Sequence, residues 1–266
     1  MEGYSAPGGR PGRLAGRRIL IVGAGQRDHG LEDPPIGNAR AMAVLFASEG
    51  AALTLADSDA ESLEATEALV REQGAECAVM LADPAEETGI EAIFARAQGA
   101  FGGVDGLVMN VGIGAGQGFA GTTVEDWDRV MAVNLRSHFL GCKQALASFV
   151  GGGAIVLIGS LAGRESMPIP AYAASKAALE SLCRNAAVEG APHVRVNVLA
   201  PGLIDTSLGR LATQANPRAD VRIPAGRHGS AWEVARCALF LISDDSSYVT
   251  GQTLVADGGL SIAART

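Results

Sequence analysis

The sequence predicts an α/β protein built on a parallel β-sheet that carries helices on both faces. Short apolar segments rich in Val, Ile and Leu alternate with helical patterns from Arg18 to the end of the chain. Such alternation is typical of crossover connections between parallel strands, and right-handed crossovers produce a doubly wound sheet. No internal repeat or composition break divides the 266 residues. We therefore expect about seven strands in a single domain over residues 17–266, preceded by a disordered lead-in over residues 1–16.

Seven segments are predicted as strands, because three to six mostly apolar residues precede a polar residue, a glycine or a proline. They are Ile19–Val22, Ala52–Ala56, Cys77–Leu81, Val104–Met109, Ala154–Ile158, Val194–Leu199 and Thr253–Val255. The residues that follow these strands include Gly23, Asp57, Asp83, Asn110, Ser160 and Pro201. Because ligands bind outside the carboxyl ends of parallel strands, we expect these residues to line one cleft.

The segments between the strands have apolar residues spaced three or four positions apart, which predicts helices. The predicted helices are about Asn38–Glu49, Ser58–Gln73, Ala85–Gln98, a long helix from Thr122 through Leu146, Ala171–Val188, and Ser230 to about Ile242. Two of them begin with a capping box, Thr122-x-x-Glu125 and Ser230-x-x-Glu233. The segment Leu203–His228 is expected to form a mobile lid.

The composition argues against several classes of function. The chain has 21 Lys and Arg against 29 Asp and Glu, a formal net charge of −8 that disfavours nucleic-acid binding. Its 4 cysteines form no CxxC pair and its 4 histidines are widely spaced, so we expect neither a disulfide framework nor a bound metal. It lacks an apolar run of about 18 residues and a signal peptide, so we expect no membrane contact and a cytoplasmic location.

A glycine-rich turn after the first strand predicts a dinucleotide site. Gly23-Ala24-Gly25-Gln26 allows the backbone to approach a pyrophosphate, and the helix that opens at Gly37-Asn38 favours its negative charge. Asp57 ends the second strand, where a carboxylate accepts hydrogen bonds from both adenosine ribose hydroxyls and repels a 2′-phosphate. Ser58 follows it and no arginine is adjacent, so NAD is favoured over NADP.

Two features near this site have alternative interpretations. Asp83, at the end of the third strand, either positions adenine or caps the helix that follows Pro84. The long polar segment Arg27–Pro35 separates the glycine turn from the next helix. Arg27 itself either reaches a phosphate or, as its acidic neighbours favour, belongs to a solvated loop.

Tyr172 and Lys176 are the predicted catalytic pair. Positions i and i+4 of a helix lie on one face, so the phenol and the ammonium are neighbours. A nearby cation favours the phenolate and lowers the tyrosine pKa, which makes Tyr172 a general acid or base for carbinol–carbonyl interconversion. Ser160 follows a neighbouring strand, where its hydroxyl can polarise a substrate oxygen. Asn134 is a mediocre helix former inside a long helix, and holding a water molecule beside Lys176 would explain it.

With these residues in place, the sequence resembles the short-chain dehydrogenase/reductase family, in its compact single-domain form with a Rossmann-like fold. The resemblance spans about Leu14 to Gly259. It is carried by Ile21-Val22-Gly23-Ala24-Gly25, Asp57, Asp83, Asn110-Val111-Gly112, Asn134, Ser160, Tyr172-x-x-x-Lys176, Asn197, Pro201-Gly202, Thr206 and Asp257-Gly258-Gly259.

The resemblance implies a specific set of roles. Tyr172 is the acid/base, Ser160 orients the substrate oxygen, and Lys176 holds the nicotinamide ribose and lowers the tyrosine pKa. Asn134 anchors a proton-relay water. Further cofactor contacts are implied at Asn110, Gly112, Pro201, Ile204 and Thr206. Family members commonly form tetramers through their two long helices and last strand, so a homotetramer, or a homodimer, is expected.

The chain departs from the family pattern at three places. Val22 stands where the family usually has threonine. Gly23 and Gly37, the first two motif glycines, are 14 residues apart, much further than is usual, and Ala39 replaces the third glycine. The usual Asn-Asn-Ala-Gly is Met109-Asn110-Val111-Gly112. These changes concern the pyrophosphate contacts and leave the four catalytic positions intact.

The predicted function is therefore NAD-dependent interconversion of a secondary alcohol and a ketone, with three alternatives. Enoyl-thioester reductases also lengthen the glycine loop, but they separate Tyr and Lys more widely than here. A 3-oxoacyl-[acyl-carrier-protein] reductase would use NADPH, which Asp57 disfavours. A non-catalytic nucleotide-binding protein would have no need of all four residues. Ile113, Ala162 and Met167 suggest a mainly apolar small-molecule substrate, whose identity the sequence does not specify.

Overall fold

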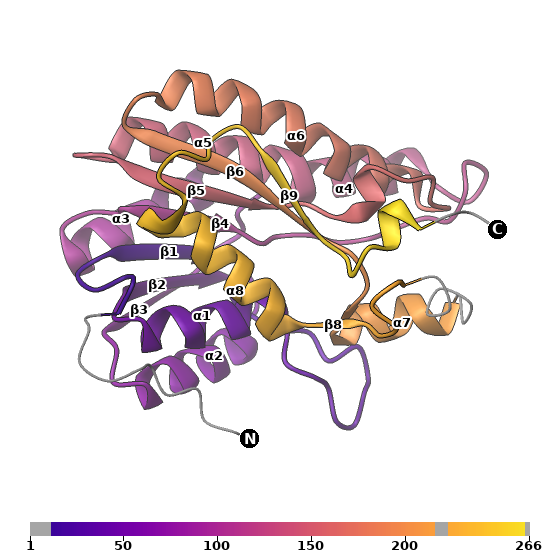
Figure 1. Cartoon of the computed structure of the whole chain (residues 1–266), viewed down its shortest axis with the longest axis horizontal. Helices are drawn as coiled ribbons and strands as arrows, with labels where there is room; N and C mark the ends of the chain where they lie inside the picture. Colours follow the sequence, from indigo (N-terminus) through magenta and orange to yellow (C-terminus); the bar gives the residue numbers. More distant parts are fainter. Residues whose placement is uncertain (1–11, 216–222, 264–266) are drawn as a thin grey trace.

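The computed structural model describes residues 12–215 and 223–263. Seven strands form one parallel sheet in the order β3-β2-β1-β4-β5-β6-β9 (Figure 1). They are β1 (Arg18–Val22), β2 (Ala52–Asp57), β3 (Cys77–Leu81), β4 (Gly106–Met109), β5 (Gly153–Ile158), β6 (Val194–Pro201) and β9 (Thr253–Ala256). The strand order reverses direction between β1 and β4, which is where open α/β sheets bind ligands. The predicted Rossmann-like, doubly wound sheet is confirmed.

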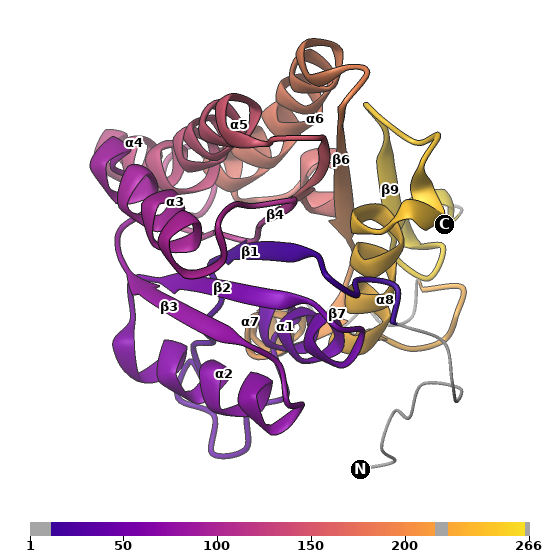
Figure 2. The same ribbon diagram turned by 90° about the vertical axis from the view of Figure 1, so that its left-hand side faces the viewer.

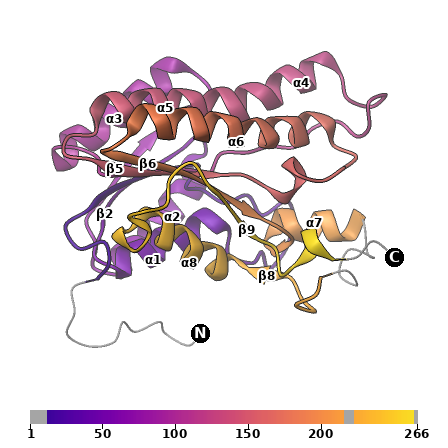
Figure 3. The same ribbon diagram turned by 45° about the horizontal axis from the view of Figure 1, so that its top comes forward.

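Helices cover both faces of this sheet (Figures 2 and 3). One face carries α3 (Glu87–Phe101), α4 (Val124–Met131), α5 (Ser137–Ser148) and α6 (Pro170–Gly190), and the other carries α1 (Asn38–Ser48), α2 (Ala60–Glu72) and α8 (Ala231–Ile242). Strand β1 faces both layers, with Ile19 and Ile21 in one apolar cluster and Leu20 and Val22 in the other. Burial on both faces explains why its sequence is apolar throughout.

The long helix predicted from Thr122 through Leu146 consists of α4, a π-helical segment Ala132–Arg136, and α5. Its capping residue is Thr123, whose side chain accepts a hydrogen bond from the Asp126 N–H at 3.0 Å. The capping box predicted at Thr122 is therefore wrong: the Thr122 hydroxyl donates to a backbone carbonyl in the preceding loop, and Thr123 caps the helix with a single side-chain hydrogen bond. The capping box that opens α8 at Ser230 is confirmed.

The ordered part of the chain begins before residue 17. Leu14 is fully buried, and its N–H donates to the Glu49 carbonyl at 3.0 Å. The Arg13 guanidinium also pairs with the Glu49 carboxylate at 2.7 Å. The expected disordered lead-in over residues 1–16 is therefore wrong for residues 12–16, since one leucine among glycines and arginines gives no periodic signal. Residues 1–11 lie outside the described residues.

The segment expected as a lid contains secondary structure that the sequence pattern did not predict. Strands β7 (Ile204–Asp205) and β8 (Gly229–Ser230) pair in a separate two-stranded sheet, and α7 (Ser207–Ala215) follows β7. Thr206 immediately precedes this helix, and its hydroxyl accepts the Gly209 N–H at 3.2 Å. Residues 216–222 of the expected lid lie outside the described residues.

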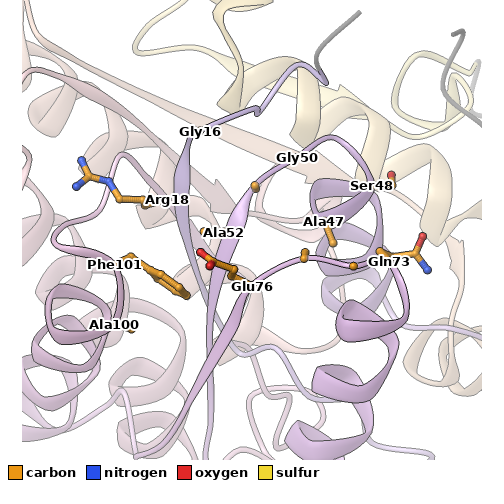
Figure 4. A pocket seen from close by; sticks show the side chains of 13 residues that line it. Gly16, Arg18, Ala47, Ser48, Gly50, Ala52, Gln73, Glu76, Ala100 and Phe101 are labelled. Carbon is orange, nitrogen blue, oxygen red and sulfur yellow. The ribbon is translucent and has the colours of Figure 1, made fainter. Parts of the chain in front are cut away.

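A hollow of about 720 Å³ lies at the amino-terminal edge of the sheet (Figure 4). Its lining includes Arg18 and Ala52, the first residues of β1 and β2, together with Gly50, Glu76 and Phe101. It is therefore at the opposite end of the strands from the residues predicted to bind a ligand. Across the described ranges, no helix has the length and apolarity that crossing a membrane requires.

Candidate active site

The strand register brings the predicted site residues to one edge of the sheet. Val22 of β1 is aligned with Ala56 of β2 and with Met109 of β4, so the residues that follow these three strands are neighbours. Ile158 of β5 is likewise aligned with Leu199 of β6. The carboxyl ends of the strands therefore lie side by side along one edge of the sheet, as the sequence predicts.

The turn after β1 and the end of β4 are in direct backbone contact. Gly23 has a φ of +79°, and a Cβ at this position would lie 3.0 Å from the Val111 nitrogen. The Asn110 side-chain amide donates to the Gly23 carbonyl at 3.0 Å. Glycine is required here both by the left-handed backbone and by the close approach. Asn110 therefore joins β4 to the glycine turn.

Helix α2 holds the same turn from the other side. The Ser62 hydroxyl accepts the Gln26 N–H and donates to the Gln26 carbonyl at 2.8 Å, and the Thr66 hydroxyl donates to the Ala24 carbonyl at 3.0 Å. A Cβ on Gly25 would lie 2.8 Å from the Ser62 hydroxyl oxygen, so a side chain there would displace α2. Sequence reasoning missed Ser62 and Thr66, because nothing in their local pattern indicates a contact with the first loop.

The Asp57 carboxylate is oriented by three backbone N–H groups. One oxygen accepts the Gly25 N–H at 2.7 Å, and the other accepts the N–H groups of Ser58 and Asp59 at 2.8 and 3.1 Å. An ionised carboxylate has about four acceptor positions, so capacity remains for a ligand hydroxyl. The end of β2 thus presents a fixed acceptor in the cleft.

The N-terminus of α1 has the features of an anion site. Its N-cap residue is Gly37, which supplies no side-chain hydrogen bond, so the first N–H groups of the helix lack a capping side chain. The side-chain oxygen of Asn38 is buried without a hydrogen-bond partner. The uncapped α1 N–H groups and the close-packed turn at Gly23 fit a pyrophosphate, whereas the Asp57 and Asn38 oxygens are acceptors that fit hydroxyl or N–H donors of a bound dinucleotide.

Asp83 does not cap α3. Its carboxylate accepts the Ala85 N–H at 2.9 Å across Pro84, while the N-cap residue of α3 is Glu86. The alternative of a helix cap is therefore wrong, because the turn around Pro84 delays the start of the helix. Asp83 is exposed, and a contact with adenine stays a prediction.

Tyr172, Ser160 and Lys176 lie together at the edge of β5. Tyr172 and Lys176 occupy the first half of α6, and the Lys176 Nζ atom is 5.9 Å from the centroid of the Tyr172 ring. Ser160 is the N-cap of the 3₁₀ turn Leu161–Gly163 after β5, where its hydroxyl accepts the Ala162 N–H at 3.2 Å, and it lies close enough to the Tyr172 phenol to lower the pKa of that group. The predicted proximity of these three side chains is present in the structure.

Lys176 is buried and held by backbone carbonyls. Its Nζ atom donates to the Ile158 carbonyl at 2.8 Å and to the Val111 carbonyl at 3.3 Å. Burial lowers the pKa of Lys176 to about 7. A Cβ on Gly112 would lie 3.2 Å from Nζ, so a side chain at this position would crowd the lysine head group.

Asn134 braces the loop after β4. Its side-chain oxygen accepts the Ile113 N–H at 2.8 Å, and its NH₂ group donates to the Ile113 carbonyl at 2.9 Å and to the Ser175 hydroxyl at 3.1 Å. Both amide hydrogens are thus used by the protein itself. The π-helical segment that contains Asn134 explains its presence within a helix, because such bulges are frequent at functional sites.

The pKa of Tyr172 is raised above its ordinary value because the phenol is buried, and the neighbouring Ser160 hydroxyl opposes this shift. The sequence predicts the opposite direction, through the lysine cation. The difference arises because Lys176 is itself easily neutralised by burial and directs its Nζ atom to two carbonyls. In this structure, desolvation dominates the charge state of the tyrosine.

His138 is an additional buried group that sequence reasoning did not assign. It lies one helical turn after Asn134, and its Nδ1 atom is 3.1 Å from the Ser137 hydroxyl. Burial and the neighbouring Lys176 hold its pKa well below the usual range. His138 is therefore a neutral neighbour of the lysine at neutral pH.

The other predicted site residues have mixed environments. Pro201 ends β6 and is buried, Ile204 is buried in β7, and Thr206 immediately precedes α7. Arg164 forms an ion pair with Glu180 at 2.5 Å, and its side chain is 43% exposed. Of the predicted pocket residues, Ala162 is buried and Met167 is exposed.

Comparisons with known proteins agree with this geometry. A family model described as "Enoyl-(Acyl carrier protein) reductase" matches residues 36–261. Levodione reductase of Leifsonia aquatica is 36% identical over 268 residues, which cover 94% of this chain and 96% of the relative. "Inactive 2-(S)-hydroxypropyl-CoM dehydrogenase 2" of Xanthobacter autotrophicus is 40% identical over 232 residues, which cover 83% of this chain and 99% of that relative.

Solved structures show the same similarity. The crystal structure of a short-chain dehydrogenase/reductase from Burkholderia xenovorans aligns with a TM-score of 0.88 and 37% identity, and the alignment covers 96% of this chain and all of that one (100%). The residues matched by the family model include Asp57, Ser160 and the Tyr172–Lys176 pair. The chain belongs to the short-chain dehydrogenase/reductase family of oxidoreductases.

Proposed function

We propose that the protein is an NAD-dependent oxidoreductase that interconverts a secondary alcohol and a ketone, with Tyr172 as the general acid/base. The observation that carries this proposal is the convergence of Tyr172, Ser160 and the buried Lys176 at the carboxyl edge of the sheet. A relative that is 36% identical is named for a ketone-reducing activity, levodione reductase.

The four residues have distinct roles in this proposal. When bound, the nicotinamide supplies or accepts the hydride. The Tyr172 hydroxyl transfers a proton to or from the substrate oxygen, and Ser160, which neighbours the phenol, orients that oxygen. Lys176 lies beside the phenol and would hold the nicotinamide ribose, and Asn134 fixes the loop at Ile113 that borders the lysine.

The raised pKa of Tyr172 has a consequence for direction. A phenol with a raised pKa carries its proton at neutral pH, which is the state required to protonate a ketone oxygen during reduction. Oxidation of the alcohol requires the deprotonated tyrosine, so we expect its rate to rise toward alkaline pH. Reduction should instead vary little around neutral pH as long as Tyr172 is protonated.

The preference for NAD rests on Asp57. Its carboxylate is fixed at the end of β2 by three backbone N–H groups, and a negative charge there repels a 2′-phosphate. The same charge disfavours the main alternative, a 3-oxoacyl-[acyl-carrier-protein] reductase that uses NADPH. The matching family model is described as an enoyl reductase, which makes enoyl reduction a further alternative. Three residues separate Tyr172 from Lys176, and this short gap disfavours that activity.

A non-catalytic nucleotide-binding role is the second candidate function. It is favoured by one observation, the relative that is 40% identical and is named as inactive. Against it stands the full set of Asn134, Ser160, Tyr172 and Lys176 in this chain, which nucleotide binding alone does not require.

We also infer a homotetramer or homodimer. The exposed apolar side chains Trp127, Phe139 and Val188 lie on α4, α5 and α6, the helices through which family resemblance implies assembly. Light scattering of the purified chain tests this inference, and a monomer at micromolar concentration would contradict it.

A cofactor and substrate screen tests the proposed function. Absorbance of the reduced nicotinamide is followed with NAD or NADP across a panel of apolar secondary alcohols, and with NADH or NADPH across the matching ketones. We expect turnover with NAD and NADH on at least one pair. Binding of NAD without turnover on any compound would support the non-catalytic candidate, and a preference for NADP would overturn the assignment to Asp57.

A further inference from the structure

The insertion between Gly23 and Gly37 creates a structural problem for the cleft. Ten residues, 27–36, separate the glycine turn from the N-cap of α1, yet a pyrophosphate can contact both only if they remain adjacent. Gln26 is the last residue of the turn, and Gly37 is the first residue after the inserted segment. The path of the chain at the end of the insertion therefore decides whether the N-terminus of α1 faces the glycine turn.

The side chain of Gln26 joins the two ends of the insertion. Its Oε1 atom accepts the Gly37 N–H at 2.6 Å, and its Nε2 atom donates to the Pro35 carbonyl at 3.1 Å. A Cβ on Gly37 would lie 3.2 Å from Oε1, so the approach is close. The oxygen and the nitrogen of the side-chain amide thus each make one hydrogen bond, and both bonds are to the backbone at the end of the insertion.

The backbone of Gln26 is itself fixed. Ser62 of α2 accepts its N–H and donates to its carbonyl at 2.8 Å, so the glutamine projects from an anchored position. Because the Gly37 N–H is used by the glutamine, the α1 N–H groups left for a ligand are those after Gly37. Their direction depends on the position of Gly37, and hence on Gln26.

We propose that Gln26 is a positioning residue for the dinucleotide: its side-chain amide replaces the short turn of related proteins and holds the α1 N-terminus against the glycine turn. This inference rests on the proposed dinucleotide site. It also adds to the role predicted for the Gly23–Gln26 turn, because both polar ends of the Gln26 side chain bind the chain itself. Gln26 therefore acts on binding of the pyrophosphate, and the contacts of adenosine at Asp57 do not depend on it.

The test compares Gln26→Leu with Gln26→Asn and a control, Glu32→Ala, an exposed residue of the same inserted segment. Leucine removes both hydrogen bonds, and asparagine keeps the amide but is too short to make both. Calorimetry measures the affinity of the full-length protein for NADH, ADP and adenosine, and thermal unfolding confirms that each variant is folded. Adenosine lacks the pyrophosphate, so its affinity shows whether a variant affects pyrophosphate binding alone or the whole dinucleotide site.

We expect Gln26→Leu and Gln26→Asn to weaken NADH and ADP binding about tenfold, the effect of losing one or two neutral hydrogen bonds. Adenosine binding should be unchanged, the KM for the dinucleotide should rise, and kcat at saturating dinucleotide should stay within about twofold. The control should behave as the wild type. Wild-type affinity for ADP in both folded glutamine variants would overturn the inference, whereas failure of the wild type to bind NADH would instead contradict the proposed function.

Discussion

Lys176 provides the sharpest electrostatic prediction. Burial lowers its pKa from the ordinary 10.5 to about 7. The chain has just one other lysine, Lys143, which is exposed and lies 2.6 Å from the Glu87 carboxylate, a contact that raises its pKa. Two lysines with opposite shifts give a matched internal control. Carbon-13 NMR of lysine-labelled protein should show one side chain titrating near pH 7 and the other above pH 10.5.

The lowered pKa also sets the sign of a stability change. Between the folded pKa of about 7 and the unfolded value of 10.5, the unfolded chain binds more protons, so stability rises with pH. Integrated from pH 7 to pH 10, this effect amounts to roughly 3 kcal/mol, at about 1.4 kcal/mol for each pH unit. Lys176→Met removes it. The variant also removes the hydrogen bonds from Lys176 to the Ile158 and Val111 carbonyls. This loss lowers the free energy of unfolding at both pH values, so it cancels when the stability at pH 10 is compared with that at pH 7.

Urea unfolding of the wild type, Lys176→Met and Lys143→Met at pH 7 and pH 10 measures this difference. We expect the gain in stability on raising the pH to be smaller by roughly 3 kcal/mol in Lys176→Met than in the other two proteins. An equal pH dependence in all three, or a Lys176 resonance that titrates near 10.5, would refute the argument from burial.

Three further predictions address the cofactor site and the fold. Asp57→Asn keeps an acceptor but removes the charge, so the ratio of kcat/KM with NADP to that with NAD should rise about tenfold or more; an unchanged ratio would show that Asp57 does not set the preference. The Arg227 ion pair and the Ser230 N–H lower the pKa of Glu233 to about 2, which stabilises the fold above pH 4.5 and is lost as the pH falls toward 2. Because the Glu233 side chain is 43% exposed, we expect Glu233→Gln to lose only about 1 kcal/mol at pH 7 and nothing at pH 2, as read from urea midpoints. Leu14→Ala should cost about 2–5 kcal/mol and lower the melting temperature by several degrees, and a loss below 0.5 kcal/mol would contradict the packing of residues before 17.

The sheet was predictable because its strands are buried on both faces. Apolar segments such as Ile19–Val22 have no alternative to a buried parallel strand between two helical layers, and the observed β1 begins just one residue earlier. The pair β7 and β8 was not predictable, since each has only two residues and their pairing joins positions about 25 apart in sequence. The π-helical segment at Asn134 likewise has no periodic signal.

The candidate site was predictable in its residue types and less so in its contacts. Strand-end positions identify Asp57 and Ser160, because side chains there must meet at one edge. The hydrogen bonds of Ser62 and the double contact of Gln26 depend on the approach of α2 and on the path of the insertion, which local patterns do not encode. The direction of the Tyr172 pKa was wrong in the sequence argument, because helix spacing shows a neighbouring cation but not the depth of burial.

Tyr172→Phe tests the central claim most directly, because it removes one oxygen atom and leaves the ring in place. Calorimetry with NADH and steady-state turnover on a substrate identified in the screen are measured on the same preparation. We predict that the dissociation constant for NADH stays within about twofold, while kcat/KM falls by roughly 10²–10⁴. Turnover within tenfold of the wild type would contradict the assignment of Tyr172 as the proton-transferring group.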